Sequence, residues 1–386
     1  MKWNNKGNEN ISSYKEHNFK SGFYVFGAGD IGRGLYITLS KYKLFKGFID
    51  NNVEKQKSGY MGQRVYSYDD CKETLDTIIV AANFENEEII SEQLKKDNKR
   101  YITSEQFLNE MFPSYLIEQK ILFMNLAQIC VTERCTLHCE YCAHGCYAVD
   151  NKQHDMRLED TIYSADTLFQ HIDYIHEFVL IGGEPLLYAD LAELIQYIGE
   201  NYRDKIGTLS ITSNGTLIPK DDVIEQCMKF DVLIRISNYI RSIPNIENQH
   251  QKIRNLCEIN DVELLIGKAE EQWWDYGFGD VLPAISSEEV AKRFDACRTP
   301  CREVRGDSLY FCVMARTVSE NLKLNIGLND CLNLRNLPHD DHSKRIIYEY
   351  NLGFSDKGYL DMCYRCRGKE SMKFPVPAAK QLRGQI

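Results

Sequence analysis

Apolar segments of strand length alternate with amphipathic segments of helix length over most of this 386-residue chain. This alternation limits the possible folds more than any other feature of the sequence. Near-continuous apolar strands that alternate with helices indicate a parallel sheet covered on both faces. The pattern falls into blocks, and we predict an α/β protein with three domains at residues 22–110, 122–290 and 296–370.

The first block predicts a Rossmann-like domain. Its first strand, FYVFGAG, leads through Gly27, Gly29 and Gly32 into a helix, and its second strand, FKGFID, ends at Asp50. Such a glycine-rich turn binds dinucleotide phosphates, and an acidic residue about 20 positions later contacts the ribose. Asp30 would compete with a phosphate for the first N–H groups of the helix. NAD, another nucleotide or nucleotide-sugar, and a structural or partner-binding role therefore all stay open.

Three cysteines follow the first strand of the second block, in the sequence CTLHCEYC. Cys135, Cys139 and Cys142 offer three thiolates, whereas a [4Fe-4S] cluster normally takes four. A metal centre with an open position is suited to bind a reactive ligand. A later strand runs into Gly182, Gly183, Glu184 and Pro185, and the next strand ends in SITSNG. A zinc knuckle or a chance group of cysteines is the alternative interpretation.

In this order, the motifs resemble those of the radical S-adenosylmethionine (radical SAM) superfamily. The resemblance implies a partial (β/α) barrel in which the three thiolates bind a cluster and S-adenosylmethionine chelates its open iron. It also implies that the turn at 182–185 holds the amino group and that Tyr141 lies near the adenine. Ligands gather at the carboxyl ends of parallel strands. We therefore expect further cofactor contacts from Ser213, Asn214, Arg235 and Ser237.

The third block is rich in cysteine, and regular periodicity fades there, so we expect a metal to stabilise it. Its spacing resembles the twitch domain, the shorter relative of the SPASM domain, which carries an auxiliary [4Fe-4S] cluster. The resemblance implies Cys297, Cys312, Cys363 and Cys366 as ligands. Cys301 stays open in place of Cys297, and a four-cysteine zinc site is the alternative to a cluster.

The resemblance implies a 5′-deoxyadenosyl radical that removes a hydrogen atom from a substrate carbon. An auxiliary cluster with four cysteine ligands has no open iron and suits electron transfer, as in the twitch-containing aminocyclitol dehydrogenase that this arrangement resembles. The leading prediction is an oxidoreductase that oxidises a secondary alcohol of a sugar, aminocyclitol or nucleotide-sugar. Peptide modification and a non-catalytic iron-sulfur redox or binding protein are alternatives. Epimerisation of a sugar carbon is another, and its hydrogen donor would be Cys146, Cys257, Cys301 or Cys331.

Composition restricts the partners and the compartment. The formal net charge of −10 argues against nucleic acid. The polar start lacks a secretory signal, and no apolar run approaches the roughly 18 residues of a membrane span. Fourteen cysteines in such a chain indicate metal binding in a reducing compartment. We expect a cytoplasmic protein with no membrane contact, a sugar-like small-molecule substrate and a low-potential electron donor of the flavodoxin or ferredoxin type.

An aromatic stretch separates the second block from the third. It either lines a sugar pocket or fills the junction between the blocks. Its members are Trp273, Trp274, Tyr276 and Phe278.

Overall fold

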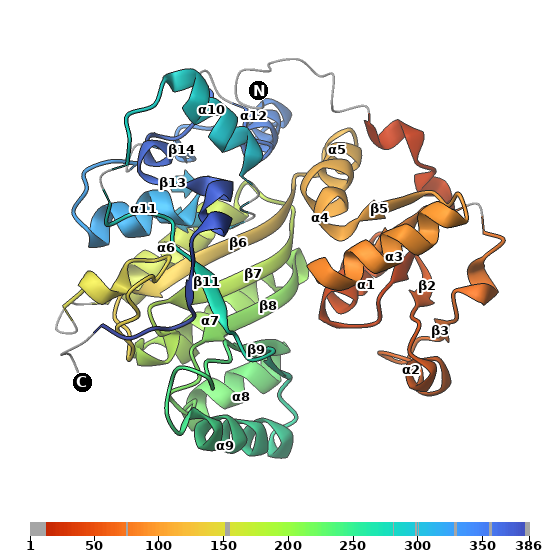
Figure 1. Ribbon diagram of the computed structural model, residues 1–386, viewed down its shortest axis with the longest axis horizontal. Helices are drawn as coiled ribbons and strands as arrows, with labels where there is room; N and C mark the ends of the chain where they lie inside the picture. Colours follow the sequence, from red (N-terminus) through yellow and green to blue (C-terminus); the bar gives the residue numbers. More distant parts are fainter. Residues whose placement is uncertain are drawn as a thin grey trace. The chain divides into compact units, whose positions relative to one another are not determined.

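The computed structural model describes residues 13–74, 76–150, 155–280, 282–297, 299, 301–327, 330–354 and 357–382. Contacts divide the chain into two compact units, one that reaches Asn125 and one that continues from Leu126. Figure 1 labels many of the helices and strands of both units.

The N-terminal unit is built on a five-stranded parallel sheet with the order β3-β2-β1-β4-β5. A sheet that extends in both directions from its first strand is Rossmann-like, which confirms the α/β fold predicted for this block. The strands are β1 (Phe23–Phe26), β2 (Phe45–Ile49), β3 (Val65–Tyr66), β4 (Ile78–Val80) and β5 (Tyr101–Thr103). The helices are α1 (Asp30–Lys41), α2 (Val53–Ser58), α3 (Phe84–Lys96), α4 (Ser104–Gln106) and α5 (Phe112–Ile117), with a π-helical turn at Phe107–Met111.

The turn between β1 and α1 needs Gly27 and Gly32 for packing. Gly27 has a φ of 125°, and a Cβ there would lie 2.1 Å from the carbonyl oxygen of Ala81. A Cβ at Gly32 would lie 2.0 Å from the carbonyl oxygen of Gly27. Only glycine permits such an approach. Gly27 and Gly32 therefore have a structural explanation that involves no ligand.

An aromatic cluster that the sequence pattern does not indicate fills the core beside this sheet. Phe19 stacks on Tyr115 with ring centroids 3.8 Å apart, and Phe107 stacks on Phe112 at 5.1 Å. Phe123 meets Phe112 edge-on at 5.0 Å. Large buried rings contribute strongly to core stability. Residues that lie between the predicted domains thus belong to this core.

The second unit contains an eight-stranded sheet with the order β10-β9-β8-β7-β6-β12-β13-β14. Neighbouring strands from β7 to β10 are parallel, which agrees with the alternation predicted for the second block. The strands of that block are β6 (Phe123–Thr132), β7 (Tyr174–Gly182), β8 (Ile206–Ser213), β9 (Val232–Ile236) and β10 (Leu264–Ile266). Its helices are α6 (Leu158–Phe169), α7 (Leu191–Tyr202), α8 (Asp221–Phe230) and α9 (Ile246–Ile259).

The cysteine-rich block has more regular structure than its faded periodicity predicts. β12 (Arg302–Arg305) pairs parallel with β6, and β13 (Ser308–Tyr310) and β14 (Cys331–Asn333) continue the sheet in antiparallel fashion. Strands of three or four residues are too short to show a period. Their regular structure therefore depends on pairing with a distant strand, which the local sequence does not predict. The helices are α10 (Ser287–Ala296), α11 (Val313–Asn321) and α12 (Asp341–Asn351), and β11 (Gln272–Trp274) pairs separately with β15 (Pro375–Pro377).

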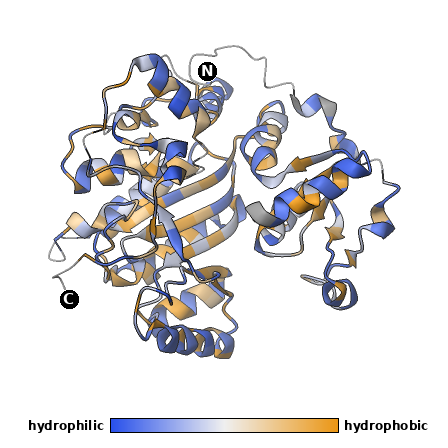
Figure 2. Cartoon of the chain, viewed as in Figure 1, coloured by the Kyte–Doolittle hydropathy of each residue, from blue (hydrophilic) through white to orange (hydrophobic). Residues whose placement is uncertain are grey.

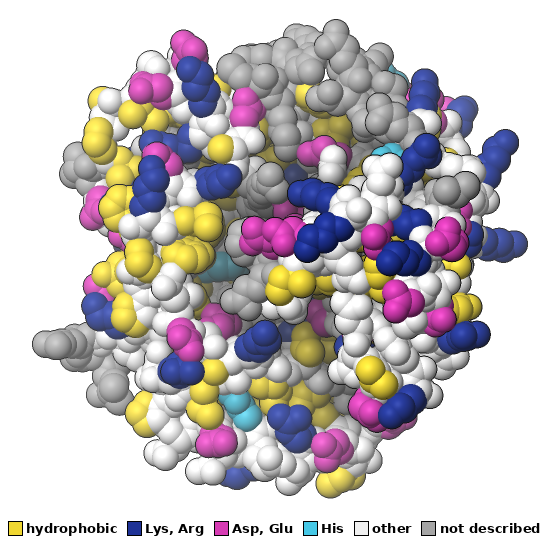
Figure 3. Space-filling view, turned by 45° about the vertical axis from the view of Figure 1, so that its right-hand side comes forward, with side chains coloured by type: hydrophobic (Ala, Val, Ile, Leu, Met, Phe, Trp, Pro, Cys, Tyr) yellow, Lys and Arg dark blue, Asp and Glu magenta, His cyan; other side chains and the backbone are white. Residues whose placement is uncertain are grey.

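Hydrophobic residues concentrate on the strands of both sheets, whereas outer helices such as α9 carry hydrophilic residues (Figure 2). On the face in Figure 3, acidic and basic side chains are interspersed. Within the described part of the chain, no helix has both the length and the apolar character needed to cross a bilayer.

Candidate functional site

Several strands of the second unit end at one edge of the sheet, and the predicted site residues follow these ends. The N–H of Gly183 donates to the carbonyl of Thr132 at 2.9 Å, so the ends of β6 and β7 are adjacent. The N–H of Ser237 donates to the carbonyl of Ser213 at 2.9 Å, which joins the ends of β8 and β9. The fold therefore brings the separate motifs to one place.

We call residues 133–146, which follow β6, the cysteine loop. It places three thiols in one packed cluster, because Cys139 lies in a buried group against which Cys135 and Cys142 pack. Burial raises the pKa of Cys135 to about 11 and that of Cys139 to about 12, and the Cys142 thiol adds to both effects. A hydrogen bond with Cys146 lowers the pKa of Cys142. Metal ligation takes thiolates and releases their protons, and three adjacent thiols can offer three such ligands.

The glycine turn at 182–185 lies directly on the strand end that precedes the cysteine loop. A Cβ at Gly182 would lie 2.2 Å from the carbonyl oxygen of Thr132. At Gly183, a Cβ would lie 2.1 Å from the carbonyl oxygen of Arg134. The paired glycines thus fix the approach of β7 to β6. Pro185 follows and begins a short 3₁₀ turn.

Glu184 links this turn to the end of β8. Its side chain is fully buried; Oε1 accepts the Leu186 N–H at 3.1 Å and Oε2 accepts the Asn214 N–H at 2.8 Å. Burial raises the pKa of Glu184 to about 7. Asn214 in turn directs its Nδ2 to the sulfur of Cys135 at 3.5 Å. A continuous chain of contacts therefore runs from the glycine turn to the cysteine loop.

The other predicted cofactor contacts have partners within the protein. Ser213 is buried, and its Oγ accepts the Gly215 N–H at 3.0 Å. Arg235 pairs with Glu177, its Nε 2.9 Å from Oε1. The ring of Tyr141 lies 5.6 Å from the Lys380 ammonium. Ser237 follows β9 at the same edge.

A second set of thiols gathers around the ends of α10 and α11. Cys297 caps the end of α10 and Cys312 the start of α11. Burial raises the pKa of Cys366 to about 12 and raises that of Cys363 well above its usual value, and the Cys297 thiol adds to both effects. Arg293 holds the Cys363–Cys366 turn, because its Nη1 donates to both carbonyls at 3.1 and 2.9 Å.

The surroundings of Cys301 differ from those of Cys297. Burial raises the pKa of the Cys301 thiol, and its charged neighbours are Arg302, Glu177 and Glu303. By contrast, Cys297 contributes to the pKa of Cys312 as well as those of Cys363 and Cys366.

Both thiol sets have the donor chemistry of iron-sulfur ligands, three cysteines in one and four in the other. Among the described residues, no group of three or more His, Cys, Asp or Glu side chains is arranged to hold a single metal ion. A four-iron cluster occupies more space than one ion. All fourteen cysteines are described, and none forms a disulfide.

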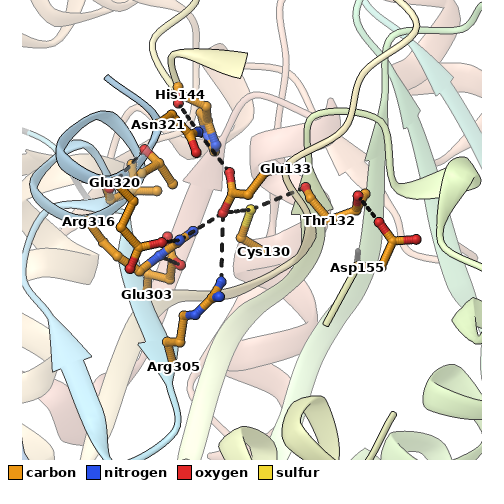
Figure 4. A network of polar contacts seen from close by, with 12 residues as sticks. Cys130, Thr132, Glu133, His144, Asp155, Glu303, Arg305, Arg316, Glu320 and Asn321 are labelled. Atoms are coloured by element: carbon orange, nitrogen blue, oxygen red, sulfur yellow. Dashed lines mark hydrogen bonds and ion pairs between the residues drawn. The ribbon is translucent and has the colours of Figure 1, made fainter. Parts of the chain in front are cut away.

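A buried ionic network connects the cysteine loop to the third block (Figure 4). Arg316, fully buried on α11, pairs with Glu303 of β12 and places Nη1 2.7 Å from Oε1 of Glu133. Asn321 donates to the other oxygen of Glu133 at 3.0 Å and to the carbonyl of His144 at 2.8 Å. This network was not predicted from the sequence, because Glu133, Glu303 and Arg316 lie on separate elements and charged residues are ordinarily expected at the surface.

In the N-terminal unit, the glycine-rich turn between β1 and α1 is hydrogen-bonded to Asp50. Asp50 Oδ2 accepts the Ala28 N–H at 2.9 Å, and Oδ1 accepts the Asn52 N–H at 2.9 Å. Lys55 pairs with the same carboxylate at 3.3 Å. Gly29 has open space around the position of a Cβ. A nucleotide ligand for this unit stays a prediction.

The aromatic stretch lies against both thiol sets. Trp273 packs on the group that contains Cys139, and its Nε1 donates to Glu270 at 2.7 Å. Burial raises the pKa of Tyr276 to about 12, and the nearby thiols, Cys366 first, add to the effect. The ring of Tyr276 stacks on Phe278 with centroids 5.7 Å apart.

Comparison with known proteins identifies one region of the chain. Residues 129–263 match the model of the Radical SAM superfamily. An uncharacterized protein of Methanocaldococcus jannaschii is 32% identical over 108 residues, which are 28% of this chain and 36% of that protein. The GTP 3′,8-cyclase of Ectopseudomonas mendocina is 32% identical over 98 residues, 25% of this chain and 28% of that protein. The chain thus spans about a third of the length of these curated relatives.

Solved structures also resemble parts of the chain. BtrN in complex with AdoMet and 2-DOIA is 14% identical, with a TM-score of 0.37, and the match covers 63% of this chain and 92% of BtrN. SuiB of Streptococcus suis bound to S-adenosylmethionine is 19% identical, with a TM-score of 0.31, over 56% of this chain and 49% of SuiB.

Proposed function

Since the chain carries a radical SAM domain at residues 129–263, we propose that Cys135, Cys139 and Cys142 bind the [4Fe-4S] cluster of that domain and leave one iron for S-adenosylmethionine. The mutual packing of these thiols supports the assignment. When bound, this cluster and S-adenosylmethionine supply a carbon radical that removes a hydrogen atom from the substrate. The chain's own part is to hold the ligand loop: Glu184 accepts the Asn214 N–H, and Asn214 contacts the Cys135 sulfur.

The second thiol set is proposed as the ligand set of an auxiliary [4Fe-4S] cluster. Cys297 is preferred over Cys301, because Cys297 influences the pKa of each of the other three thiols whereas Cys301 faces charged side chains. Arg293 keeps the last two ligands in place through their carbonyls. Four cysteine ligands leave no iron for a substrate, so the role of this set is electron transfer.

The proposed reaction is the oxidation of a secondary alcohol of a sugar, aminocyclitol or nucleotide-sugar. The observation that carries it is the second thiol set, since an all-cysteine cluster can take up the electron left on the substrate after a hydrogen atom and a proton have gone. The product is then a ketone. A low-potential donor of the flavodoxin or ferredoxin type would supply the electron that starts each turnover.

The substrate class is tested with candidate alcohols deuterated at the carbinol carbon. The anaerobically reconstituted protein receives S-adenosylmethionine, dithionite and one compound at a time, with GTP included because relatives are named GTP 3′,8-cyclase. We expect deuterium in 5′-deoxyadenosine and a ketone that has lost two hydrogen atoms. A product one mass unit lighter, with a hydrogen atom in place of the carbinol deuterium, would instead indicate epimerisation, and consumption of GTP alone would indicate cyclisation. Either result contradicts the proposed oxidation.

The role of the second set is tested by Cys312→Ser. We expect this variant to cleave S-adenosylmethionine and to form no ketone, because the electron acceptor is lost. Cys227→Ser is the matched control, since Cys227 is buried on α8 and belongs to neither thiol set. Full ketone formation by Cys312→Ser contradicts an electron-transfer role.

A further inference from the structure

The C-terminal segment crosses the cysteine loop as a strap, which we define as residues 375–382. It begins with β15, which pairs with β11, and continues with Ala378 and Ala379, both fully buried. The Glu140 N–H donates to the Lys380 carbonyl at 2.8 Å, and the Leu382 N–H donates to the His138 carbonyl at 2.9 Å. The strap is therefore hydrogen-bonded to the backbone that carries the ligand cysteines.

Within this strap, the side chain of Gln381 reaches a ligand sulfur. Its Oε1 accepts the His138 N–H at 2.8 Å, and its Nε2 lies 2.7 Å from the Ala379 carbonyl oxygen and 3.2 Å from the Cys139 sulfur. A backbone N–H can only donate and a carbonyl can only accept, so these two contacts fix which end of the amide is nitrogen. The sulfur of Cys139 therefore faces a hydrogen-bond donor.

The other two thiols of the loop have donors of their own. Cys135 faces the Leu137 N–H at 3.4 Å and Asn214 Nδ2 at 3.5 Å. Cys142 is hydrogen-bonded by Cys146. Each sulfur thus has a donor close in the fold, and the donor to Cys139 comes from the far end of the sequence.

We propose that Gln381 is a positioning residue for Cys139 that sets the reduction potential of the cluster on Cys135, Cys139 and Cys142. The inference rests on the proposed function, because it needs that cluster. Reduction adds negative charge to the cluster, and an N–H donor to a ligand sulfur stabilises that charge, so the donor raises the potential.

The test is Gln381→Met, which keeps the length of the side chain and removes the donor. The midpoint potential of the reconstituted holoenzyme is measured by EPR-monitored redox titration, and the relevant signal is identified by its change when S-adenosylmethionine is added. We expect about a tenfold lower ratio of reduced to oxidised cluster at a fixed potential, which is a shift of about 59 mV to more negative values. An unchanged potential overturns the proposal.

Ser242→Ala distinguishes the loss of the hydrogen-bond donor to Cys139 from a displacement of the strap. Ser242 Oγ donates to the Ala378 carbonyl and does not contact the sulfur, so we expect its potential to equal that of the wild type. An equal shift in Ser242→Ala would assign the effect to the strap as a whole and overturn the role of Gln381. If Gln381→Met does not fold, Gln381→Glu keeps the acceptor for His138 and lacks the donor. Its carboxylate charge also disfavours reduction, so a negative shift at least as large is expected.

A wild-type protein without a signal that responds to S-adenosylmethionine would contradict the proposed function itself. A responsive signal whose potential in both Gln381 variants equals that of the wild type would contradict only the inference about Gln381.

Discussion

Arg316 is the residue on which the contact between the cysteine loop and the third block depends. It is fully buried and lies between the carboxylates of Glu133 and Glu303. Burial disfavours the charge of Glu133, but Arg316 and Asn321 outweigh burial and lower its pKa. A buried ion pair adds little net stability compared with apolar packing, yet it is costly to break from one side. The network therefore fixes the loop mainly through its geometry.

We expect Arg316→Met to destabilise the cluster-free protein by about 3–5 kcal/mol, because it leaves buried carboxylates without their cation. Urea denaturation followed by circular dichroism measures this change. Lys292→Met, which removes an exposed pair with Glu288 on α10, is the control and should change stability far less. Equal changes in the free energy of unfolding for the two substitutions would show that the buried network contributes no more to stability than an exposed ion pair.

Glu303 predicts how stability depends on pH. Burial raises its pKa from 4.5 to about 7. Glu133 adds to this increase, whereas Arg316 and Arg305 act against it. The folded protein then keeps a proton that the unfolded chain has lost, so the unfolding free energy contributed by this group falls as pH rises from about 4.5 to about 7. Glu303→Gln lacks this titration. Urea unfolding across that range should show the wild type losing stability relative to the variant, and parallel pH profiles would contradict the assignment.

At the residue scale, the cysteine triplet and the glycine turn at 182–185 were proposed as site residues from local motifs, whose members lie close together along the chain. The second thiol set extends from Cys297 to Cys366 and was proposed from the resemblance of its spacing to the twitch domain. Gln381 and Arg316 could not be predicted, because their partners are far away in sequence and a single Gln or Arg carries no pattern. Ser213 and Arg235 stay predicted cofactor contacts, and each also has a polar partner within the protein.

At the element scale, the contact between β6 and β7 fixes the site. The ends of these strands place Gly182 and Gly183 against the carbonyl oxygens of Thr132 and Arg134. A Cβ at Gly182 would lie 2.2 Å from the first oxygen, and a Cβ at Gly183 would lie 2.1 Å from the second. The strands and helices of the second block were predictable, because each has a clear apolar pattern. The strands of the third block were not predictable, because their sequences are too short to show an apolar pattern and their structure depends on the pairing of β12 with β6.

We expect Gly183→Ala to lower the unfolding free energy by about 1–3 kcal/mol, because the new methyl group has no room and the strand ends must separate. The same shift should reduce formation of 5′-deoxyadenosine by the reconstituted protein. Gly279→Ala is the matched control, since a Cβ at Gly279 meets no atom within 4 Å. A Gly183→Ala protein as stable and active as Gly279→Ala would mean that this close contact does not shape the site.

At the scale of the whole molecule, the chain has a Rossmann-like unit and a second unit, in which residues 129–263 match the model of the Radical SAM superfamily and the sheet continues into the cysteine-rich block. The alternation of strands and helices predicted the class of both sheets. The aromatic core around Phe107 and Phe112 was not predictable, because aromatic residues spread over separate segments show no period. What the N-terminal unit binds stays a prediction, since Asp50 is engaged by its own turn.

The central claim is that one thiol set supports cleavage of S-adenosylmethionine while the other holds a separate cluster. The most direct test measures iron content and 5′-deoxyadenosine in the anaerobically reconstituted protein given S-adenosylmethionine and dithionite, with the triple variant Cys135→Ala, Cys139→Ala, Cys142→Ala beside the wild type. We predict about eight irons and 5′-deoxyadenosine in the wild type, and about four irons with no 5′-deoxyadenosine in the variant. Absence of 5′-deoxyadenosine from the wild type, or its undiminished formation by the variant, would contradict this account.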